Sequence, residues 1–224
     1  MIRRPPRSTL SSSSAASDVY KRQVRASLAE YADILVGPGI ERGLLGPREA
    51  DKVWDRHIIN CAVVAEPDLE VIGTGARIAD IGSGAGLPGL VWALARPDVS
   101  VVLIESLLRR VTFLTECITV LELTDRVHVF RARAEEAAGH AGSFDIVTAR
   151  AVAPLGNVAR WAAPLLLPDG ALVAIKGESA QEEVTRDGQI LEELGLTGPV
   201  VTQMGRGVVD PPTTVVIARL AKAE

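Results

Sequence analysis

Short apolar runs alternate with longer stretches of helical periodicity from residue 77 to the end of the chain. The apolar runs predict strands at 78–81, 101–104, 127–130, 144–149, 171–175, 200–203 and 214–220. Between them, apolar residues recurring every three or four positions predict helices at 92–95, 107–121, 158–166 and 181–194. Because strands that alternate with helices form βαβ units, we predict an α/β fold with a doubly wound, mostly parallel sheet.

The two ends of this pattern differ from its middle. The last two strands are joined by a short stretch containing Pro211-Pro212, which leaves no room for a helical crossover. We therefore expect a C-terminal antiparallel hairpin that closes a domain spanning 71–224. Residues 24–70 show helical spacing only, with a first helix that stops at Gly37-Pro38-Gly39 and a second that starts after Pro47. This short helical segment precedes the sheet.

Residues 1–23 lack hydrophobic periodicity and contain a four-serine run and a Pro5-Pro6 pair. They also lack the apolar centre of a secretory signal. The segment resembles a translated sequencing adapter, so we interpret it as a non-native or disordered leader. We exclude it from the functional reasoning.

Composition narrows the function classes. Hydrophobic residues make up 47% and charged residues 23%, without an apolar stretch long enough to span a membrane, so we expect no membrane partner. The net charge of −4 divides into +4 for residues 1–23 and −8 for the remainder, which argues against a protein that coats nucleic acid by charge alone. Two cysteines and three scattered histidines indicate neither a disulfide framework nor a metal site, and they suit a reducing cytoplasm.

A glycine-rich turn follows the first predicted strand and opens a helix. Gly82-x-Gly84-x-Gly86 is the loop of class I S-adenosylmethionine (SAM) methyltransferases, whereas Gly84-x-Gly86-x-x-Gly89 matches the dinucleotide fingerprint. Asp80, at the end of that strand, would repel a pyrophosphate but favours the cationic ammonium and sulfonium of SAM. The charge therefore favours SAM, although an aspartate here can also simply cap the turn.

Two further acidic positions fit a nucleoside ligand. Glu105 ends the second strand, about twenty residues after the glycine turn, where a carboxylate can accept hydrogen bonds from ribose hydroxyls. Ala134 and Glu135 follow the third strand and are expected beside the adenine. Taken alone, Glu135-Glu136 is also an ordinary helix start.

The acceptor should lie where the fourth and fifth strands end. Arg150 and Lys176 occupy these ends, and we predict that they position the acceptor, because ligands bind outside the carboxyl ends of such strands. Two alternatives for Arg150 are the carboxylate of SAM and an ion pair with Asp145. Arg56-His57 either caps this pocket or belongs to the plain surface.

The acceptor chemistry is constrained by what these segments contain. The fourth strand does not end in the Asn/Asp-Pro-Pro-aromatic motif of amino-group methyltransferases. Cys61 and Cys117 do not follow a proline, so we interpret them as small buried hydrophobes rather than cytosine-directed nucleophiles. An acceptor with a free lone pair, such as guanine N7, needs no general base, and its catalysis depends mainly on alignment.

Several motifs together resemble the RsmG family, also called GidB, and the likeness covers residues 24–224. It rests on Trp54–Asn60, Asp80–Gly89, Arg110–Leu114, Arg133–Glu136, Phe144-Asp145 with Arg150-Ala151, and Ile175–Gly177. The Gly-Leu-Pro-Gly end of the loop and the Arg-His-Ile element are the specific ones. In two respects the chain departs from the family. The additional helix expected before Val24 is replaced by the leader, and the acidic surface leaves RNA docking unexplained unless basic residues gather on one side: Arg56, Arg109, Arg110, Arg150 and Lys176.

The resemblance implies a cytoplasmic, SAM-dependent enzyme that methylates N7 of a guanosine in the decoding-region loop of bacterial 16S rRNA. The substrate would be 16S rRNA or a precursor of the small ribosomal subunit, and we expect a monomer. By motif, Gly82 and Leu87 would line the SAM pocket, Glu105 would face the ribose, and Arg150 would complete the site. Ala134-Glu135 would lie on the adenine side.

Other functions remain open at this point. A small-molecule methyltransferase of the same fold is the main alternative, followed by an NAD(P)-dependent oxidoreductase. A non-enzymatic nucleoside-binding regulator would bind ligand without turnover.

Overall fold

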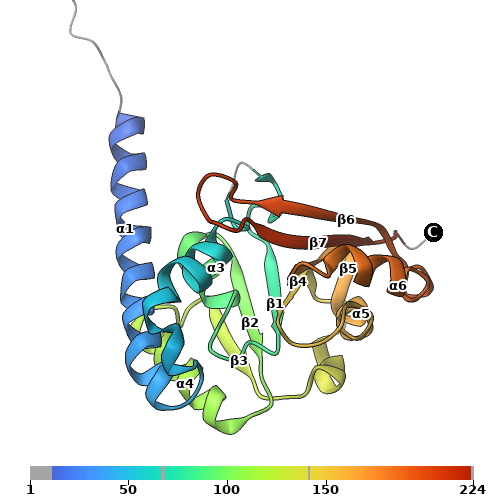
Figure 1. Cartoon of the computed structure of the whole chain (residues 1–224), viewed down its shortest axis with the longest axis horizontal. Coiled ribbons are helices and arrows are strands. Elements are labelled where there is room, and N and C mark those ends of the chain that lie inside the picture. The colour runs from blue at the N-terminus through green and yellow to red at the C-terminus, as the bar shows by residue number, and fades with distance from the viewer. Residues whose placement is uncertain (1–11, 67–68, 141, 223–224) are drawn as a thin grey trace, which may run out of the picture.

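A seven-stranded sheet in the order β3-β2-β1-β4-β5-β7-β6 forms the centre of the molecule (Figure 1). The computed structural model describes residues 12–66, 69–140 and 142–222. Strands β1 to β5 pair in parallel, and β7 pairs antiparallel with both β5 and β6. The strands are β1 (Arg77–Ile81), β2 (Ser100–Ile104), β3 (Val127–Phe130), β4 (Phe144–Arg150), β5 (Leu166–Lys176), β6 (Leu196–Met204) and β7 (Thr213–Leu220). The predicted strands and the C-terminal hairpin are therefore confirmed.

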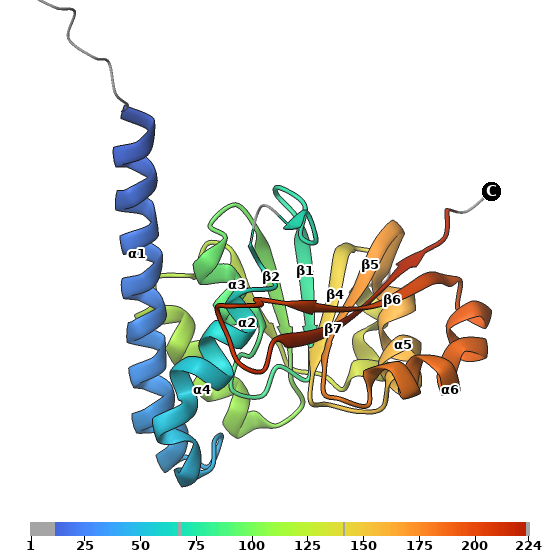
Figure 2. The same cartoon turned by 45° about the horizontal axis from the view of Figure 1, so that its top comes forward.

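Helices cover both faces of the sheet (Figure 2). Helices α1, α3 and α4 lie on one side, and α5 and α6 lie on the other. The α-helices are α1 (Ser12–Ile34), α2 (Asn60–Ala62), α3 (Gly89–Ala95), α4 (Leu108–Val120), α5 (Leu155–Ala162) and α6 (Ala180–Glu193). Within the described residues, every helix is too short or too polar to span a bilayer.

The sheet separates two hydrophobic cores because successive residues of a strand point to opposite faces. In β1, Ile78 packs into the core with α3 and α4, whereas Ala79 packs into the core with α5 and α6. In β5, Val173 and Leu172 divide in the same way. Both faces are apolar, which explains why these strands read as continuous apolar runs without alternation.

The N-terminal segment departs from the prediction in two ways. Residues 12–23, expected to be disordered, form the first turns of α1, while residues 1–11 lie outside the described part. The expected stop at Gly37-Pro38-Gly39 is wrong: the chain continues as a π-helical segment, Leu35–Gly39, with Pro38 inside it. Leu35 and Gly39 are buried there, so tertiary packing holds a helical path that local sequence disfavours.

The predicted second helix consists of three short pieces. A 3-10 helix (Pro47–Lys52) leads into a π-helical segment (Val53–Ile59) and then into α2. Another 3-10 helix, Ala134–His140, follows β3.

The direction in which strands are added to the sheet reverses after β3: β2 and β3 lie on one side of β1, and β4 and β5 lie on the other. In such sheets the ligand binds in the crevice at the carboxyl ends of the strands where the order reverses.

Candidate active site

The glycine turn after β1 adopts a backbone that other residues rarely adopt. Gly82, Gly84 and Gly86 all have positive φ angles, of 65°, 59° and 97°. A Cβ on Gly86 would lie only 2.5 Å from Leu90 Cδ1, so this position has no room for a side chain. The space beside Gly84 is open, with nothing nearer than 3.8 Å. The turn is thus closed toward the core at Gly86 and open at Gly84.

Asp80 supports the turn from behind. Its carboxylate is fully buried, and Oδ2 accepts a hydrogen bond of 3.0 Å from the backbone N–H of Gly89. Oδ1 has no partner among the described residues, and burial raises the pKa of Asp80 to about 7. Asp80 does not line the cavities described below. Its position matches the capping alternative for this residue better than direct contact with a cation.

Glu105, in contrast, faces a cavity of about 300 Å³ beside the turn. Its Oε2 accepts 3.0 Å from the backbone N–H of Gly84, and Oε1 accepts 3.0 Å from the N–H of Leu107. The guanidinium of Arg110 approaches Oε2 at 3.4 Å. A carboxylate has about four acceptor sites, so Glu105 keeps acceptor capacity for hydroxyl groups. We call this the donor cavity.

The donor cavity gathers four of the nine residues predicted for SAM, and Arg150 lines the other cavity described below. Gly82, Glu105, Ala134 and Glu135 line the donor cavity, together with the half-buried Trp161, which the sequence reasoning missed. Gly84 reaches it indirectly through its hydrogen bond to Glu105, while Gly86 and Leu87 lie in the buried wall of the turn. The missed tryptophan comes from α5, and its spacing there carries no signal beyond ordinary helix packing.

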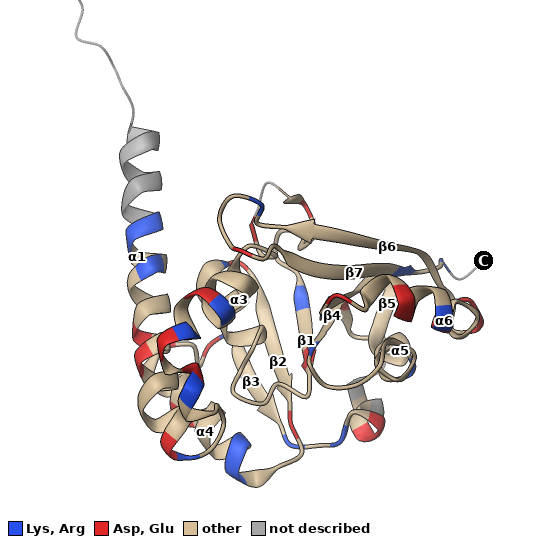
Figure 3. Ribbon diagram, viewed as in Figure 1, with Lys and Arg blue, Asp and Glu red and all other residues tan. Residues whose placement is uncertain are grey.

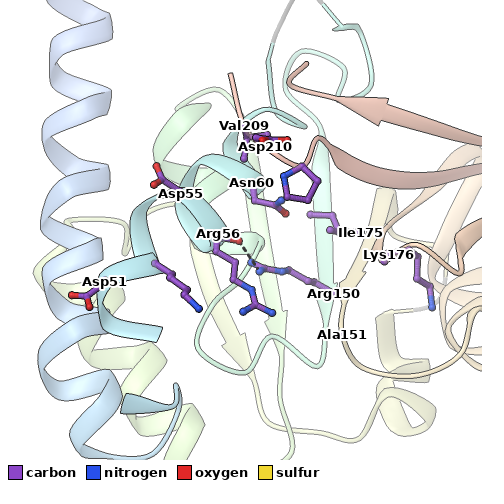
Figure 4. A pocket seen from close by; sticks show the side chains of 13 residues that line it. Asp51, Asp55, Arg56, Asn60, Arg150, Ala151, Ile175, Lys176, Val209 and Asp210 are labelled. Carbon is purple, nitrogen blue, oxygen red and sulfur yellow. Dashed lines mark hydrogen bonds between the residues drawn. The ribbon is translucent and has the colours of Figure 1, made fainter. Parts of the chain in front are cut away.

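A second cavity of about 650 Å³ opens at the ends of β4 and β5, and we call it the acceptor cavity. Arg56 and Arg150 point into its centre, while Lys176 lies to one side (Figure 4). The Lys176 ammonium is held at 2.8 Å by both the Ala153 carbonyl and a carboxylate oxygen of Glu183. Lys176 borders the acceptor cavity, but its charge is already paired within the protein.

Arg150 is held by the N-terminal helical segment. Its guanidinium donates to Cys61 Sγ at 3.1 Å, to the carbonyl of Arg56 at 3.1 Å, and to His57 Nδ1 at 2.8 Å. Asp145, the alternative ion-pair partner, instead accepts from the backbone N–H of Arg77 at 2.8 Å. Arg56 therefore lines the acceptor cavity, and His57 contacts Arg150 from beneath.

The two cavities meet at Ala151. This residue lines both of them and has a φ of 54°, unusual for a residue with a side chain. The next residue, Val152, packs its methyl groups over Gly82, 2.9 Å from where a Cβ would be. A group passing from the donor cavity to the acceptor cavity would cross at this point.

The other titratable groups exclude several chemistries. Burial raises the pKa of the Cys61 thiol, which disfavours its reactive thiolate form. Burial also raises the pKa of Cys117, to about 12. Among the described residues, no group of histidine, cysteine or acidic side chains could hold a metal ion. Both cysteines are therefore buried hydrophobes, as predicted.

Comparison with known proteins decides the family. The family described as rRNA small subunit methyltransferase G, or GidB, matches residues 24–205. The ribosomal RNA small subunit methyltransferase G of Salinispora tropica is 54% identical over 202 residues, covering 87% of this chain and 82% of the relative. The protein of the same name from Mycolicibacterium gilvum is 49% identical, covering 93% and 90%. The chain belongs to the RsmG (GidB) family.

Solved structures agree on the fold. A SAM-dependent methyltransferase from Aquifex aeolicus has a TM-score of 0.56 at 18% identity, covering 79% of this chain and all of that one. An RsmG protein is a SAM-dependent methyltransferase, so the dinucleotide and regulator alternatives fall away. The residues present also fit SAM: a buried carboxylate with remaining acceptor capacity faces the donor cavity beside an open glycine turn.

Proposed function

We propose that this RsmG protein methylates N7 of a guanosine in the decoding-region loop of bacterial 16S rRNA. The proposal further places the enzyme in the cytoplasm, acting as a monomer on 16S rRNA or on a small-subunit precursor. The observation that carries it is the acceptor cavity, which adjoins the donor cavity at Ala151 and offers Arg56 and Arg150 as positioning groups.

The groups around the acceptor cavity favour an acceptor that already has a lone pair. His57, beneath Arg150, is not free to act as a base, because Nδ1 is bonded to Arg150 and Nε2 lies 2.9 Å from Glu49 Oε2. Cys61 is buried and its pKa is raised, so it is unsuited to attack a cytosine ring. Guanine N7 needs neither group, because its lone pair can attack directly.

SAM supplies an electrophilic methyl group on its sulfonium. Methylation at N7 would leave the positive charge on the guanine ring, so no proton would have to leave. The chain contributes alignment: Glu105 and the glycine turn hold the donor side, and Arg150 positions the acceptor. Three acids that line the acceptor cavity, Asp51, Asp55 and Asp210, can offset the charge that develops on the base.

The arginines that could contact RNA lie at the edge formed by the carboxyl ends of the parallel strands. The chain as a whole is acidic, and basic and acidic residues are interspersed along the ribbon (Figure 3). Arg56 and Arg150 line the acceptor cavity, Arg110 lines the donor cavity, and Arg109 is exposed in the first turn of α4. All of them follow the carboxyl ends of strands or cover them. We propose that this edge docks the RNA backbone.

Nucleoside analysis tests the proposed function. The protein is incubated with radiolabelled SAM and small-subunit RNA from cells that lack this modification, and the RNA is digested to nucleosides. We expect label in 7-methylguanosine. Label in another nucleoside would reject the N7 assignment, and label only in a metabolite extract would indicate a small-molecule methyltransferase.

A further inference from the structure

The contacts of Arg150 extend beyond the acceptor cavity into the N-terminal helical segment. His57 is buried beneath the guanidinium, with 9% of its surface exposed, and its two ring nitrogens have different partners. Nδ1 lies 2.8 Å from Arg150 Nη2, and Nε2 lies 2.9 Å from Glu49 Oε2. Glu49, His57 and Arg150 thus form a continuous chain from the 3-10 helix Pro47–Lys52 to the end of β4.

Elementary hydrogen-bond chemistry fixes the proton on this histidine. A guanidinium has only donors, so the Nδ1 atom that contacts Arg150 must be an acceptor. The ring proton therefore resides on Nε2, where it is donated to the Glu49 carboxylate. Burial and the neighbouring Arg150 cation lower the pKa of His57, which favours this neutral form.

The same contacts orient Arg150. Of its five N–H groups, three are used by Cys61 Sγ, the Arg56 carbonyl and His57 Nδ1. The remaining two are left for an acceptor in the cavity. A freely rotating arginine would also donate to guanine N7, as arginines in nucleic-acid complexes commonly do, and would thereby occupy the lone pair that must accept the methyl group. Orientation is therefore part of the chemistry.

We propose that Glu49 and His57 are positioning residues for methyl transfer: Glu49 fixes the ring proton of His57, and neutral His57 holds Arg150 away from the reacting lone pair. This inference rests on the proposed function and concerns the acceptor side only. We expect unchanged SAM affinity, because Glu49, His57 and Arg150 do not line the donor cavity. A parallel loss of SAM affinity would instead assign Arg150 to the carboxylate of SAM and overturn the inference.

Protonation of His57 should break the chain. An added proton on Nδ1 would face the Arg150 guanidinium, so donor would meet donor and cation would meet cation. Glu49, Arg56 and Arg150 are the charged groups that contact or adjoin the ring. The pKa of Glu49 is itself lowered, with His57 and Arg56 as partners that stabilise its ionised form, so it stays ionised over the same pH range. We therefore expect kcat to fall at acidic pH without a loss of SAM affinity.

Two substitutions of His57 separate positioning from simple packing. His57→Phe removes both ring nitrogens, whereas His57→Asn keeps an acceptor oxygen near the Nδ1 position and cannot be protonated. We expect His57→Phe to lower kcat by about tenfold or more, and His57→Asn to retain kcat within about threefold. His57→Asn should also lose the acid-side fall in kcat. The exposed His128 in β3 provides the matched control, and His128→Asn should behave as wild type.

The measurements are kcat and KM for RNA from pH 5.5 to 8, SAM affinity by calorimetry, and folding by circular dichroism. If His57→Phe does not fold, Glu49→Gln decides, because a glutamine amide can pair with either tautomer of His57 and so no longer fixes the ring proton on Nε2. We expect kcat about threefold lower with unchanged SAM affinity. The inference is overturned if the His57→Phe and His57→Asn variants have equal kcat, or if kcat of His57→Asn still falls at acidic pH. If His57→Phe does not fold, a wild-type kcat in Glu49→Gln overturns it. Failure of wild-type protein to form 7-methylguanosine would instead reject the proposed function.

Discussion

The donor and acceptor cavities lie side by side but are built in different ways. The donor cavity is made mostly by residues 81–82, 104–106 and 132–135, which end or follow three neighbouring parallel strands. Its key contact joins Glu105 to a glycine N–H. The acceptor cavity combines the segments 51–60, 150–151, 175–177 and 209–211. One side is therefore a local property of the βαβ turns, whereas the other depends on docking of distant segments.

This difference teaches where each half of the site is vulnerable. On the donor side, backbone groups and the buried Glu105 supply the contacts, so a change in backbone space should matter most. On the acceptor side, side chains such as Arg150 act through several partners, so loss of geometry should matter even when charge is kept. Substitutions on either side should consequently have separable effects.

The largest expected effect is that of Gly84→Val on SAM binding. The position has room for a side chain in the free protein, but its φ of 59° is unfavourable for valine and its N–H must reach Glu105. We expect SAM affinity to fall by about a hundredfold or more while the protein stays folded. Calorimetry and circular dichroism would measure both.

Gly188→Val in α6 is the control for that change, since no atom lies within 4 Å of its added Cβ and it is remote from both cavities. It should bind SAM as wild type does. Wild-type affinity in Gly84→Val would mean that the turn is structural only.

Next in size is the effect of Arg150→Lys on the acceptor side. Lysine keeps the positive charge but cannot make the three separate contacts of the guanidinium. We expect kcat to fall about tenfold or more with SAM affinity unchanged within twofold. The control is Arg77→Lys, at the opposite end of the sheet, where the side chain is 54% exposed. Equal losses of kcat and SAM affinity would contradict the separation of the two cavities.

Asp80→Asn should change how stability depends on pH. Burial raises the pKa of Asp80 from 3.8 to about 7, so the folded protein keeps this proton where the unfolded chain has lost it. The contribution of Asp80 to stability therefore falls as pH rises from about 4 to about 7. The asparagine variant lacks this loss, and we expect it to gain stability relative to wild type over that range.

Denaturant unfolding at pH 5, 6, 7 and 8 would measure this relative gain. Asp98 is an informative control because its hydrogen bond with Arg96 lowers its pKa to about 2. Its contribution is present above pH 4 and is lost as pH falls toward 2, so Asp98→Asn should show no such gain between pH 5 and 8. A constant difference between Asp80→Asn and wild type would refute the role of burial at Asp80.

The smallest effect should come from Arg109→Gln. Arg109 is exposed, and one phosphate contact contributes modestly to RNA affinity. We expect KM for RNA to rise about twofold, and the slope of log affinity against log salt concentration to fall in magnitude by about one. Arg219→Gln, exposed in β7 and paired with Ala171 rather than with the carboxyl end of β5, should leave both quantities unchanged. An equal effect of both substitutions would remove the proposed docking edge.

Much of the fold was predictable because its signals are local. Apolar runs such as 101–104 and 171–175 lie in β2 and β5, and the short connection at Pro211-Pro212 correctly indicated an antiparallel pair. The exceptions are equally physical. Pro38 disfavours a helix, yet burial of Leu35 and Gly39 keeps the chain helical there. The free energy gained by burying these residues can outweigh the helix propensity of proline, which is unfavourable by about 3 kcal/mol.

The sequence by itself determined the donor side, because the spacing of Gly82, Gly84 and Glu105 along consecutive β-strands already places them at one crevice. Only the tertiary structure decided that Asp80 lies behind the turn, that Lys176 is paired with Glu183, and that His57 accepts a hydrogen bond from Arg150. The reason is that a strand order fixes which strand ends meet, whereas contacts between a side chain and a segment about ninety residues away depend on how separate layers pack.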